Sequence, residues 1–410
     1  QMTELLDEYI PYVKGSEIND DPLQPVSKFA IDLIAEKEYD TPIAWLHRSQ
    51  RYGEKLATPD VSVADLIGDI DPIKAANLKL DFADERVLHY GIIPRSNRCI
   101  FVINELPDLQ ARIQVSLFNI LEEGDLQIRG FKLRLPLDVL FVFTANPEDY
   151  TNRGSIVTPL KDRIESQILT HYPKTLETAL LITEQEAEIN NEQKERVDVS
   201  DLVKRLIEQV AFEARDSEFV DKKSGVSARL TIAAYENAVS AAERRAIINE
   251  ETKTQVWLSD LSGIIPSITG KIELVYEGEQ EGPYQVSYNL LEKAIRTQFK
   301  QYFPDPDTLK KRKGKEPAAE NPYKPITAWF DKGNALNLFT ETKDEDKVQM
   351  LYKVSGLHAL VKKHYKDISE KETALLMELV LHGLAAHSLI SKKVIDGKIE
   401  FKDLMGSRHN

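Results

Sequence analysis

The chain of 410 residues is long enough for two or three domains. Its 53 lysines and arginines are outnumbered by 67 acidic residues, and the net charge of −14 argues against a broad surface for nucleic acid or acidic membranes. A single cysteine, Cys99, excludes a disulfide framework and a cysteine-based zinc site, and no uncharged apolar run approaches the ~18 residues of a membrane span, so we expect a cytoplasmic protein.

The N-terminal part of the chain is rich in turn-forming residues. The first segment, MTELLDEYI, has apolar residues at helical spacing, and Pro11 ends this predicted helix. Residues 16–60 are polar and contain several prolines, which predicts loops with one helix near 26–37. Short apolar pieces separated by turn signals follow over 60–98.

Two strongly apolar segments come next. Residues 99–104, CIFVIN, predict a buried strand, and 139–146, VLFVFTAN, predict a strand of the kind found at the centre of a parallel sheet covered on both faces. A helix is expected between them, over 108–123. Apolar and polar residues alternate over 124–138, which predicts a β-hairpin. A further strand is expected near 167–171, so this part of the chain predicts an α/β fold.

The remainder of the chain is predicted to be mainly helical. Helical periodicity marks the segments 174–194, 199–216, 227–248, 287–302 and 345–391. A short hairpin is expected near 270–288. We therefore predict an α/β core over 1–172, a helical domain over 173–302, a linker over 303–344 and a C-terminal helical region over 345–410.

Polar residues follow both apolar strands. Asn104 and Glu105 end the first strand, where side chains project into the ligand crevice of an open α/β sheet. A Glu there can orient and deprotonate water, while its neighbour bonds the hydration shell of a metal. Asn146 ends the second strand, where its amide can hold the attacking water. The alternatives are a surface Glu and a turn-forming Asn-Pro pair.

Two arginines follow at points where they can reach phosphate. Arg163 precedes the strand expected near 167–171, and from such an edge an arginine can neutralise transition-state charge in a neighbouring subunit's site. The alternative is a surface salt bridge with Asp162 or Glu165. Arg229 lies in the first turn of a predicted helix that Ser227 can cap, and its alternative is an ordinary exposed arginine.

In this order, the features resemble those of AAA+ ATPases of the magnesium-chelatase I-subunit and MoxR-like group, over about Gln1 to Phe299. The resemblance implies a P-loop-type parallel sheet with flanking helices, a pre-sensor-1 β-hairpin at 124–138, an α-helical lid and a C-terminal helical region. It also implies roles for single residues: Asn104 and Glu105 in Walker B, Asn146 as sensor 1, Arg163 as arginine finger with Arg153 as a second candidate, and Arg229 as sensor 2.

The same resemblance implies cofactors and partners. ATP and Mg²⁺ are the expected cofactors, with Asn104 bound to the magnesium through water. An arginine finger acts only on a neighbouring subunit, so Arg163 implies a ring oligomer, by resemblance a hexamer. A partner protein with a von Willebrand A domain is a further expectation. A chaperone role is favoured over a chelatase role, and a transcription activator is disfavoured because its polymerase-contacting loop is absent from 60–98.

The sequence departs from this family pattern at two points. No Gly-Lys pair, at 270–271, 314–315 or 397–398, has the spacing of a phosphate-binding Walker A loop, so we expect about 40–60 further residues before Gln1, the length of a strand, loop and helix. Asn104 replaces the usual Asp, which keeps an oxygen but loses a charge. The second hypothesis is therefore a non-hydrolysing or weakly active regulatory or scaffold subunit.

Two other features predict no site. His382 and His387 are five residues apart, a spacing that does not place both on one helical face as metal ligands. The basic run LKKRKGK at 309–315 lies beside prolines in an acidic chain, which indicates a solvated linker instead of a nucleic-acid site.

Overall fold

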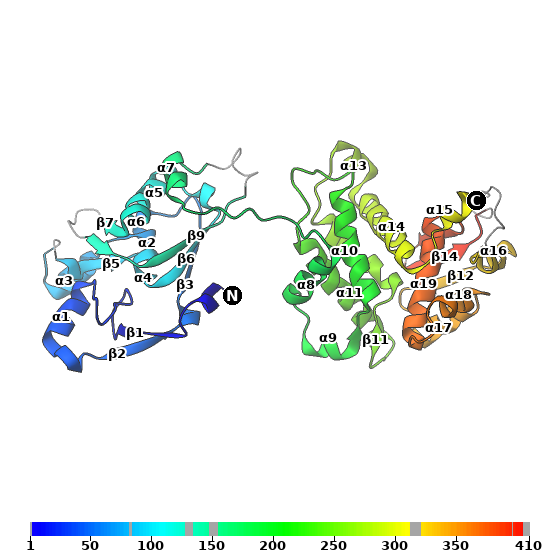
Figure 1. Cartoon of the computed structure of the whole chain (residues 1–410), viewed down its shortest axis with the longest axis horizontal. Coiled ribbons are helices and arrows are strands. Elements are labelled where there is room, and N and C mark those ends of the chain that lie inside the picture. Colours follow the sequence, from blue (N-terminus) through cyan, green and yellow to red (C-terminus); the bar gives the residue numbers. More distant parts are fainter. Residues whose placement is uncertain are drawn as a thin grey trace. The chain divides into compact units, whose positions relative to one another are not determined.

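The computed structural model of the chain describes residues 2–81, 84–127, 134–146, 155–311, 321–395 and 397–404. These residues form two compact units, Gln1–Leu169 and Thr170–Asn410, each described here by itself. Figure 1 shows strands and short helices in the first unit and long helices in the second. Among the helices of the described ranges, none combines the length and apolar character that a membrane crossing needs.

A parallel sheet of β3, β6 and β9, in that order, positions the candidate site of the first unit. The register sets Leu56 beside Asn104, and Ile103 beside Phe143. The remaining strands pair as antiparallel ribbons, β1 with β2, β4 with β5 and β7 with β8. The strands of this unit are β1 (Tyr9–Val13), β2 (Ile43–His47), β3 (Tyr52–Leu56), β4 (Gly68–Ile70), β5 (Leu88–Tyr90), β6 (Cys99–Asn104), β7 (Asp125–Gln127), β8 (Arg134–Pro136) and β9 (Val139–Phe143).

One face of the parallel sheet packs on the core of the first unit. Phe101 and Ile103 of β6 are buried there among apolar side chains of the following helices, which Figure 1 shows grouped beside the sheet. The opposite face carries Tyr52, Leu56 and Leu140, which are all exposed. Successive strand residues point to opposite faces, so this difference follows the pleat. The helices of this unit are α1 (Lys28–Lys37), α2 (Val63–Leu66), α3 (Pro72–Leu78), α4 (Ile92–Arg95), α5 (Ala111–Ser116), α6 (Phe118–Glu123) and α7 (Thr158–Arg163).

The outer edge of β9 pairs with no strand among the described residues. The strand expected near 167–171 is wrong, because this segment forms no ladder there. Ile168 and Leu169 are 88% and 74% exposed, although their apolar character predicted burial. An extended segment becomes a strand only when a neighbour supplies hydrogen bonds, and periodicity does not reveal whether that neighbour is present.

Of two further elements predicted for the first unit, the hairpin is confirmed and the N-terminal helix is not. The predicted hairpin over 124–138 is confirmed in its described part, where Leu126 of β7 pairs with Leu135 of β8, and its tip at 128–133 lies outside the described residues. The predicted N-terminal helix is wrong. Only Met2–Leu5 form one 3₁₀ turn, and Tyr9–Val13 form β1, because aromatic and β-branched residues there favour a strand paired with β2.

The second unit is a bundle of helices with small sheets. The long predicted helices are confirmed, but α13 and α14 replace the hairpin expected near 270–288. Its helices are α8 (Leu176–Glu186), α9 (Asn191–Arg196), α10 (Asp201–Arg215), α11 (Arg229–Ile248), α12 (Ile265–Thr269), α13 (Tyr276–Glu281), α14 (Pro283–Tyr302), α15 (Pro306–Lys311), α16 (Lys324–Asp331), α17 (Asp344–Tyr352), α18 (Leu357–His364) and α19 (Glu370–Ala386). Its strands are β10 (Val197–Asp198), β11 (Thr254–Gln255), β12 (Leu336–Phe339), β13 (Ser391–Ile395) and β14 (Lys398–Lys402).

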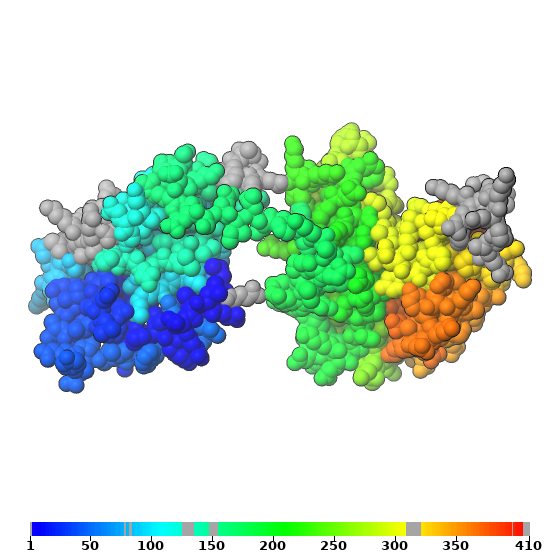
Figure 2. All heavy atoms as spheres, in the orientation of Figure 1, coloured from blue at the N-terminus to red at the C-terminus, as the bar shows by residue number. Residues whose placement is uncertain are grey.

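One continuous apolar core holds this second unit together, from Val197 to Phe401. Figure 2 shows its green, yellow and orange segments as one continuous body. Helix α19 packs against α14 at Gly383, where an added Cβ would lie 2.2 Å from the ring of Phe299, so only glycine allows this approach. The segment 303–344, expected to be a linker, contains α15, α16 and β12.

A network of buried charges ties the N-terminal helices of the second unit to its C-terminal ones. Arg245 of α11 is 2% exposed and bonds both Asp260 and Asp344. Lys347 of α17 donates to the hydroxyl of Ser259 at 2.7 Å. Glu378 of α19 accepts from the backbone of Ser259 at 3.0 Å. Because buried charges need partners, these bonds fix how the helices meet.

Candidate active site

The carboxyl ends of β6 and β9 bring Asn104, Glu105 and Thr144 together. Glu105 leaves the strand with φ 56° and ψ 49°, a left-handed conformation that costs a non-glycine residue about 1–2 kcal/mol. The backbone nitrogen of Leu106 then donates to the carbonyl of Thr144 at 2.9 Å, which ties the bend to β9. A strained residue with a carboxylate at a strand end is a feature that functional sites share.

Hydrogen bonds cross all three parallel strands at this edge. The side-chain amide of Asn104 donates to the carboxylate of Glu54 on β3. The hydroxyl of Thr144 donates to Asn104 Oδ1 at 3.3 Å and accepts from the backbone nitrogen of Glu105 at 3.1 Å. Tyr52 donates to the second oxygen of Glu54 at 2.8 Å, and this hydrogen bond raises the pKa of Tyr52.

Sequence reasoning missed Glu54 and Thr144 as members of this edge. The segment around Glu54 was predicted to be loop, because a five-residue strand with polar positions gives little signal. Tyr52, Glu54 and Leu56 share one face of β3 but mix apolar and charged side chains, so no apolar–polar alternation marks this strand.

The groups at this edge fit a hydrated magnesium ion. Glu54, Asn104, Glu105 and Thr144 offer carboxylate, amide and hydroxyl oxygens, the atoms that hard divalent cations prefer. Magnesium keeps several waters and needs only one or two carboxylates from a protein. The kinds of oxygen atom present therefore suit contact with the ion through water.

Asn146 and Arg153 follow β9. Asn146 lies three residues beyond the end of the strand and is exposed. Arg153, the second candidate finger, lies outside the described residues, which stop at 146 and resume at 155.

Arg163 ends α7 and packs within its own unit. Its guanidinium donates to the carboxylate of Glu122 from Nε at 2.8 Å, lies 4.8 Å from the centre of the Phe118 ring, and donates to the carbonyl of Pro159 at 2.8 Å. Arg163 thus forms its salt bridge with Glu122 of α6, and not with Asp162 or Glu165, the partners considered from the sequence. The side chain of Arg163 is about one-quarter exposed.

Arg229 belongs to the second unit, and Asn104 and Glu105 belong to the first. It is the exposed first residue of α11, and its backbone nitrogen donates to the hydroxyl of Ser227 at 3.2 Å. The predicted helix start is confirmed within two residues.

The strand order and the polar strand ends agree with the family resemblance. Polar residues follow adjacent parallel strands, the antiparallel hairpin precedes the second of them, and a helical unit comes next. The first unit has an α/β fold, with a parallel sheet and flanking helices. The chain as a whole resembles the AAA+ ATPases of the magnesium-chelatase I-subunit and MoxR-like group.

Solved structures similar to this chain are distant in sequence. A protein assigned as an ATPase from Cytophaga hutchinsonii is 20% identical over 59% of this chain and 76% of that chain, with a TM-score of 0.25. A BchI–BchD complex of magnesium chelatase is 16% identical over 68% of this chain and 84% of that chain, with a TM-score of 0.33. NtrX from Brucella abortus is 13% identical over 60% of this chain and 52% of that chain, with a TM-score of 0.33. No protein-family model and no curated protein matches the chain.

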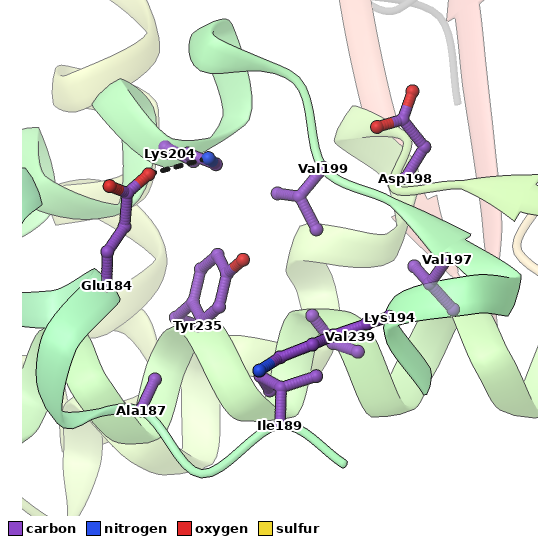
Figure 3. A pocket seen from close by; sticks show the side chains of 10 residues that line it. All are labelled: Glu184, Ala187, Ile189, Lys194, Val197, Asp198, Val199, Lys204, Tyr235 and Val239. Carbon is purple, nitrogen blue, oxygen red and sulfur yellow. Dashed lines mark hydrogen bonds and ion pairs between the residues drawn. The ribbon is translucent and has the colours of Figure 1, made fainter. Parts of the chain in front are cut away.

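A cavity of about 320 Å³ lies in the second unit, among α8, α9, β10, α10 and α11. Figure 3 shows an ion pair between Lys204 and Glu184, 2.6 Å long, at its rim, with the ring of Tyr235 nearby. Ala187, Ile189, Val197, Val199 and Val239 supply the apolar part of the wall. Burial raises the pKa of Tyr235. None of the predicted site residues lines this cavity.

Asp305, Asp307 and His387 form a cluster with metal-ligating atoms within 4.8 Å of one another. Each carboxylate already has a cationic partner, because Lys300 lies 3.2 Å from Asp305 and Arg296 lies 2.8 Å from Asp307. His387 Nδ1 also lies 2.9 Å from Asp307, so ion pairs and a hydrogen bond already join these side chains. The cluster is therefore explained by the packing of α14, α15 and α19.

Proposed function

We propose that the protein is a Mg-ATP-hydrolysing AAA+ ring motor that remodels or activates a partner protein. The observation that carries the proposal is the meeting of Asn104, Glu105 and Thr144 at the carboxyl ends of two adjacent parallel strands, with Asn146 close behind in the chain. Ligands of open α/β sheets bind at this edge.

Each residue has a distinct role in this proposal. Glu105 orients the attacking water and accepts its proton, and its left-handed backbone ends the strand at this residue. Asn104 bonds water of the metal's hydration shell through its amide oxygen. Asn146 holds the attacking water from the neighbouring strand end. A magnesium ion held through water by Asn104 would neutralise charge on the phosphates.

The phosphate-binding loop comes from outside these 410 residues in this proposal. The unpaired outer edge of β9 offers the backbone groups for one more parallel strand, and a loop following that strand would end beside Asn146 and Thr144. Leu140, Ile168 and Leu169 have exposed apolar side chains, which the added segment could cover. The 410-residue chain alone should bind ATP weakly and hydrolyse none.

Arg163 acts in trans, which makes the enzyme an oligomer, by family resemblance a hexamer in the cytoplasm. The approaching nucleotide phosphate replaces Glu122 as the partner of the guanidinium. Arg229 of the helical lid contacts the phosphate from within the same subunit. A partner with a von Willebrand A domain remains our expectation for the substrate side, with a chaperone role preferred over a chelatase role.

The test compares two carboxylates three residues apart. In the protein that includes its phosphate loop, Glu105→Gln should lower magnesium-dependent phosphate release by about 10²–10⁴-fold, the usual contribution of a catalytic acid or base. Asp108→Asn, at the end of the next turn, should leave the rate within about threefold because Asp108 lies beyond the strand edge.

The second candidate is a regulatory or scaffold subunit that does not hydrolyse ATP. The neutral Asn104 favours it, because the strand end lacks one charge of the family pattern. Equal background rates for the unsubstituted protein and for Glu105→Gln would support this candidate and refute the motor.

A further inference from the structure

The carboxylate beside Asn104 comes from a neighbouring strand. In the register of β3 and β6, Leu56 lies beside Asn104, and Glu54 shares that face because alternate residues of a strand point to the same side. One oxygen of Glu54 accepts from the amide of Asn104, and the other accepts from Tyr52 at 2.8 Å. Glu54 is thus held at both oxygens and cannot turn freely.

The chemistry of these groups fixes which way Asn104 faces. An ionised carboxylate only accepts hydrogen bonds, so Glu54 selects the nitrogen end of the amide. The oxygen end of Asn104 is left facing Thr144, whose hydroxyl donates to it at 3.3 Å. That hydroxyl in turn accepts from the backbone of Glu105 at 3.1 Å. A chain of hydrogen bonds therefore connects Glu54, through Asn104 and Thr144, to the backbone of Glu105, the proposed water-activating residue.

The presence of Glu54 also gives a reason for the amide at position 104. An aspartate there would bring two carboxylates within hydrogen-bonding distance, and like charges so close disfavour ionisation of both. Asn104 converts this repulsion into a hydrogen bond. The pair Glu54 and Asn104 carries one negative charge, the same as an aspartate at 104 beside a neutral residue at 54.

We propose that Glu54 is a positioning residue that supplies the negative charge missing at position 104 and fixes the orientation of Asn104. The negative charge of the strand end then comes from Glu54 on β3 instead of from position 104 on β6. The neutral Asn104 is therefore no sign of a degenerate site. This inference rests on the proposed function, since it assigns the charge to the hydrated metal of the nucleotide site. The same charge and hydrogen bond should form when the amide is placed at position 54 and the carboxylate at position 104.

Exchange of the two residues is the experiment. The affinity for Mn²⁺, alone and with ADP, is measured from the free-ion EPR signal for Glu54→Gln, Asn104→Asp and the double variant. Glu54→Gln should weaken Mn²⁺ binding about 10–100-fold, as loss of groups around a metal usually does. The double variant should return to within about threefold, because the amide introduced on β3 then donates to the carboxylate introduced on β6. Asp108→Asn removes an equal charge without touching Asn104 and should change little.

Several outcomes separate this inference from the proposed function. If Glu54→Gln binds Mn²⁺ as Asp108→Asn does, or the double variant is no better than Glu54→Gln, the inference is overturned while the motor stands. If the exchange restores Mn²⁺ binding, but the protein that includes its phosphate loop shows neither ADP binding nor Glu105-dependent hydrolysis, the inference stands and the motor is refuted. Because Glu54 is exposed and the substitutions preserve size, all variants should share one thermal unfolding midpoint.

Discussion

Replacing Arg245 by methionine should destabilise the second unit by about 3–5 kcal/mol, the usual cost of removing one partner of a buried ion pair. The side chain is 2% exposed and donates to Asp260 from Nε and Nη2 at 3.1 and 3.0 Å. It also bonds Asp344, Thr254 and the carbonyl of Gln255. Methionine keeps most of the stem, so the loss comes from acceptors left without a donor.

The neighbouring arginine is a matched control. Arg244 lies on the same helix and pairs with Glu341 at 3.0 Å, but its side chain is 69% exposed. Surface pairs of this kind contribute about 0–1 kcal/mol. Arg244→Met should therefore change the free energy of unfolding several times less than Arg245→Met, although both substitutions remove one charge from α11.

Urea unfolding followed by tryptophan fluorescence measures this difference. Trp257 is buried and donates to Asp344 at 2.8 Å, so its emission reports on the network itself. For a unit of this size the predicted loss lowers the thermal midpoint by about 6–20 °C. If unpaired charge is the cause, adding Asp260→Asn should recover part of the loss. Equal effects of Arg245→Met and Arg244→Met would refute the reasoning.

Two further predictions concern titrating groups. Burial raises the pKa of Glu208, so its contribution to stability should be present below pH 4.5 and lost as pH rises through the raised value. In Glu213, burial is outweighed by hydrogen bonds from Thr297 and Lys293 that lower the pKa, so Glu208→Gln and Glu213→Gln should change the pH dependence of urea unfolding with opposite sign. Burial raises the pKa of Cys99 to about 11, so a thiol reagent at pH 8 should label the folded chain ~100-fold more slowly than the urea-unfolded chain, and equal rates would contradict this burial.

The sequence predicted the parts of the fold whose signal is local. Residues 99–104 and 139–143 are strands because five or more apolar residues in succession favour the interior of a parallel sheet. Helices of the second unit were predicted from their periodicity, since a helix makes its own hydrogen bonds. The polar ends Asn104 and Glu105 were found for the same reason, because they directly follow such a strand.

The parts that were missed depend on distant residues. β3 is a short strand with exposed side chains, and it exists because β6 supplies its ladder. Glu54 therefore enters the site through a pairing across fifty residues of sequence. The segment near 167–171 has strand-forming residues but no partner among the described residues, and the hairpin expected near 270–288 is helical because α14 buries its apolar stripe against α10 and α19.

The open side of β9 also bears on the solubility of the protein. Val139–Phe143 is a run of five apolar residues without charge or proline, the composition of segments that stack into aggregates. Its backbone groups on the outer side have no strand partner in the described part of the chain, and such a side templates addition of another molecule. A strand paired with this side of β9 would thus protect the protein from aggregation. Expressing the protein without such a strand would favour inclusion bodies over a soluble product.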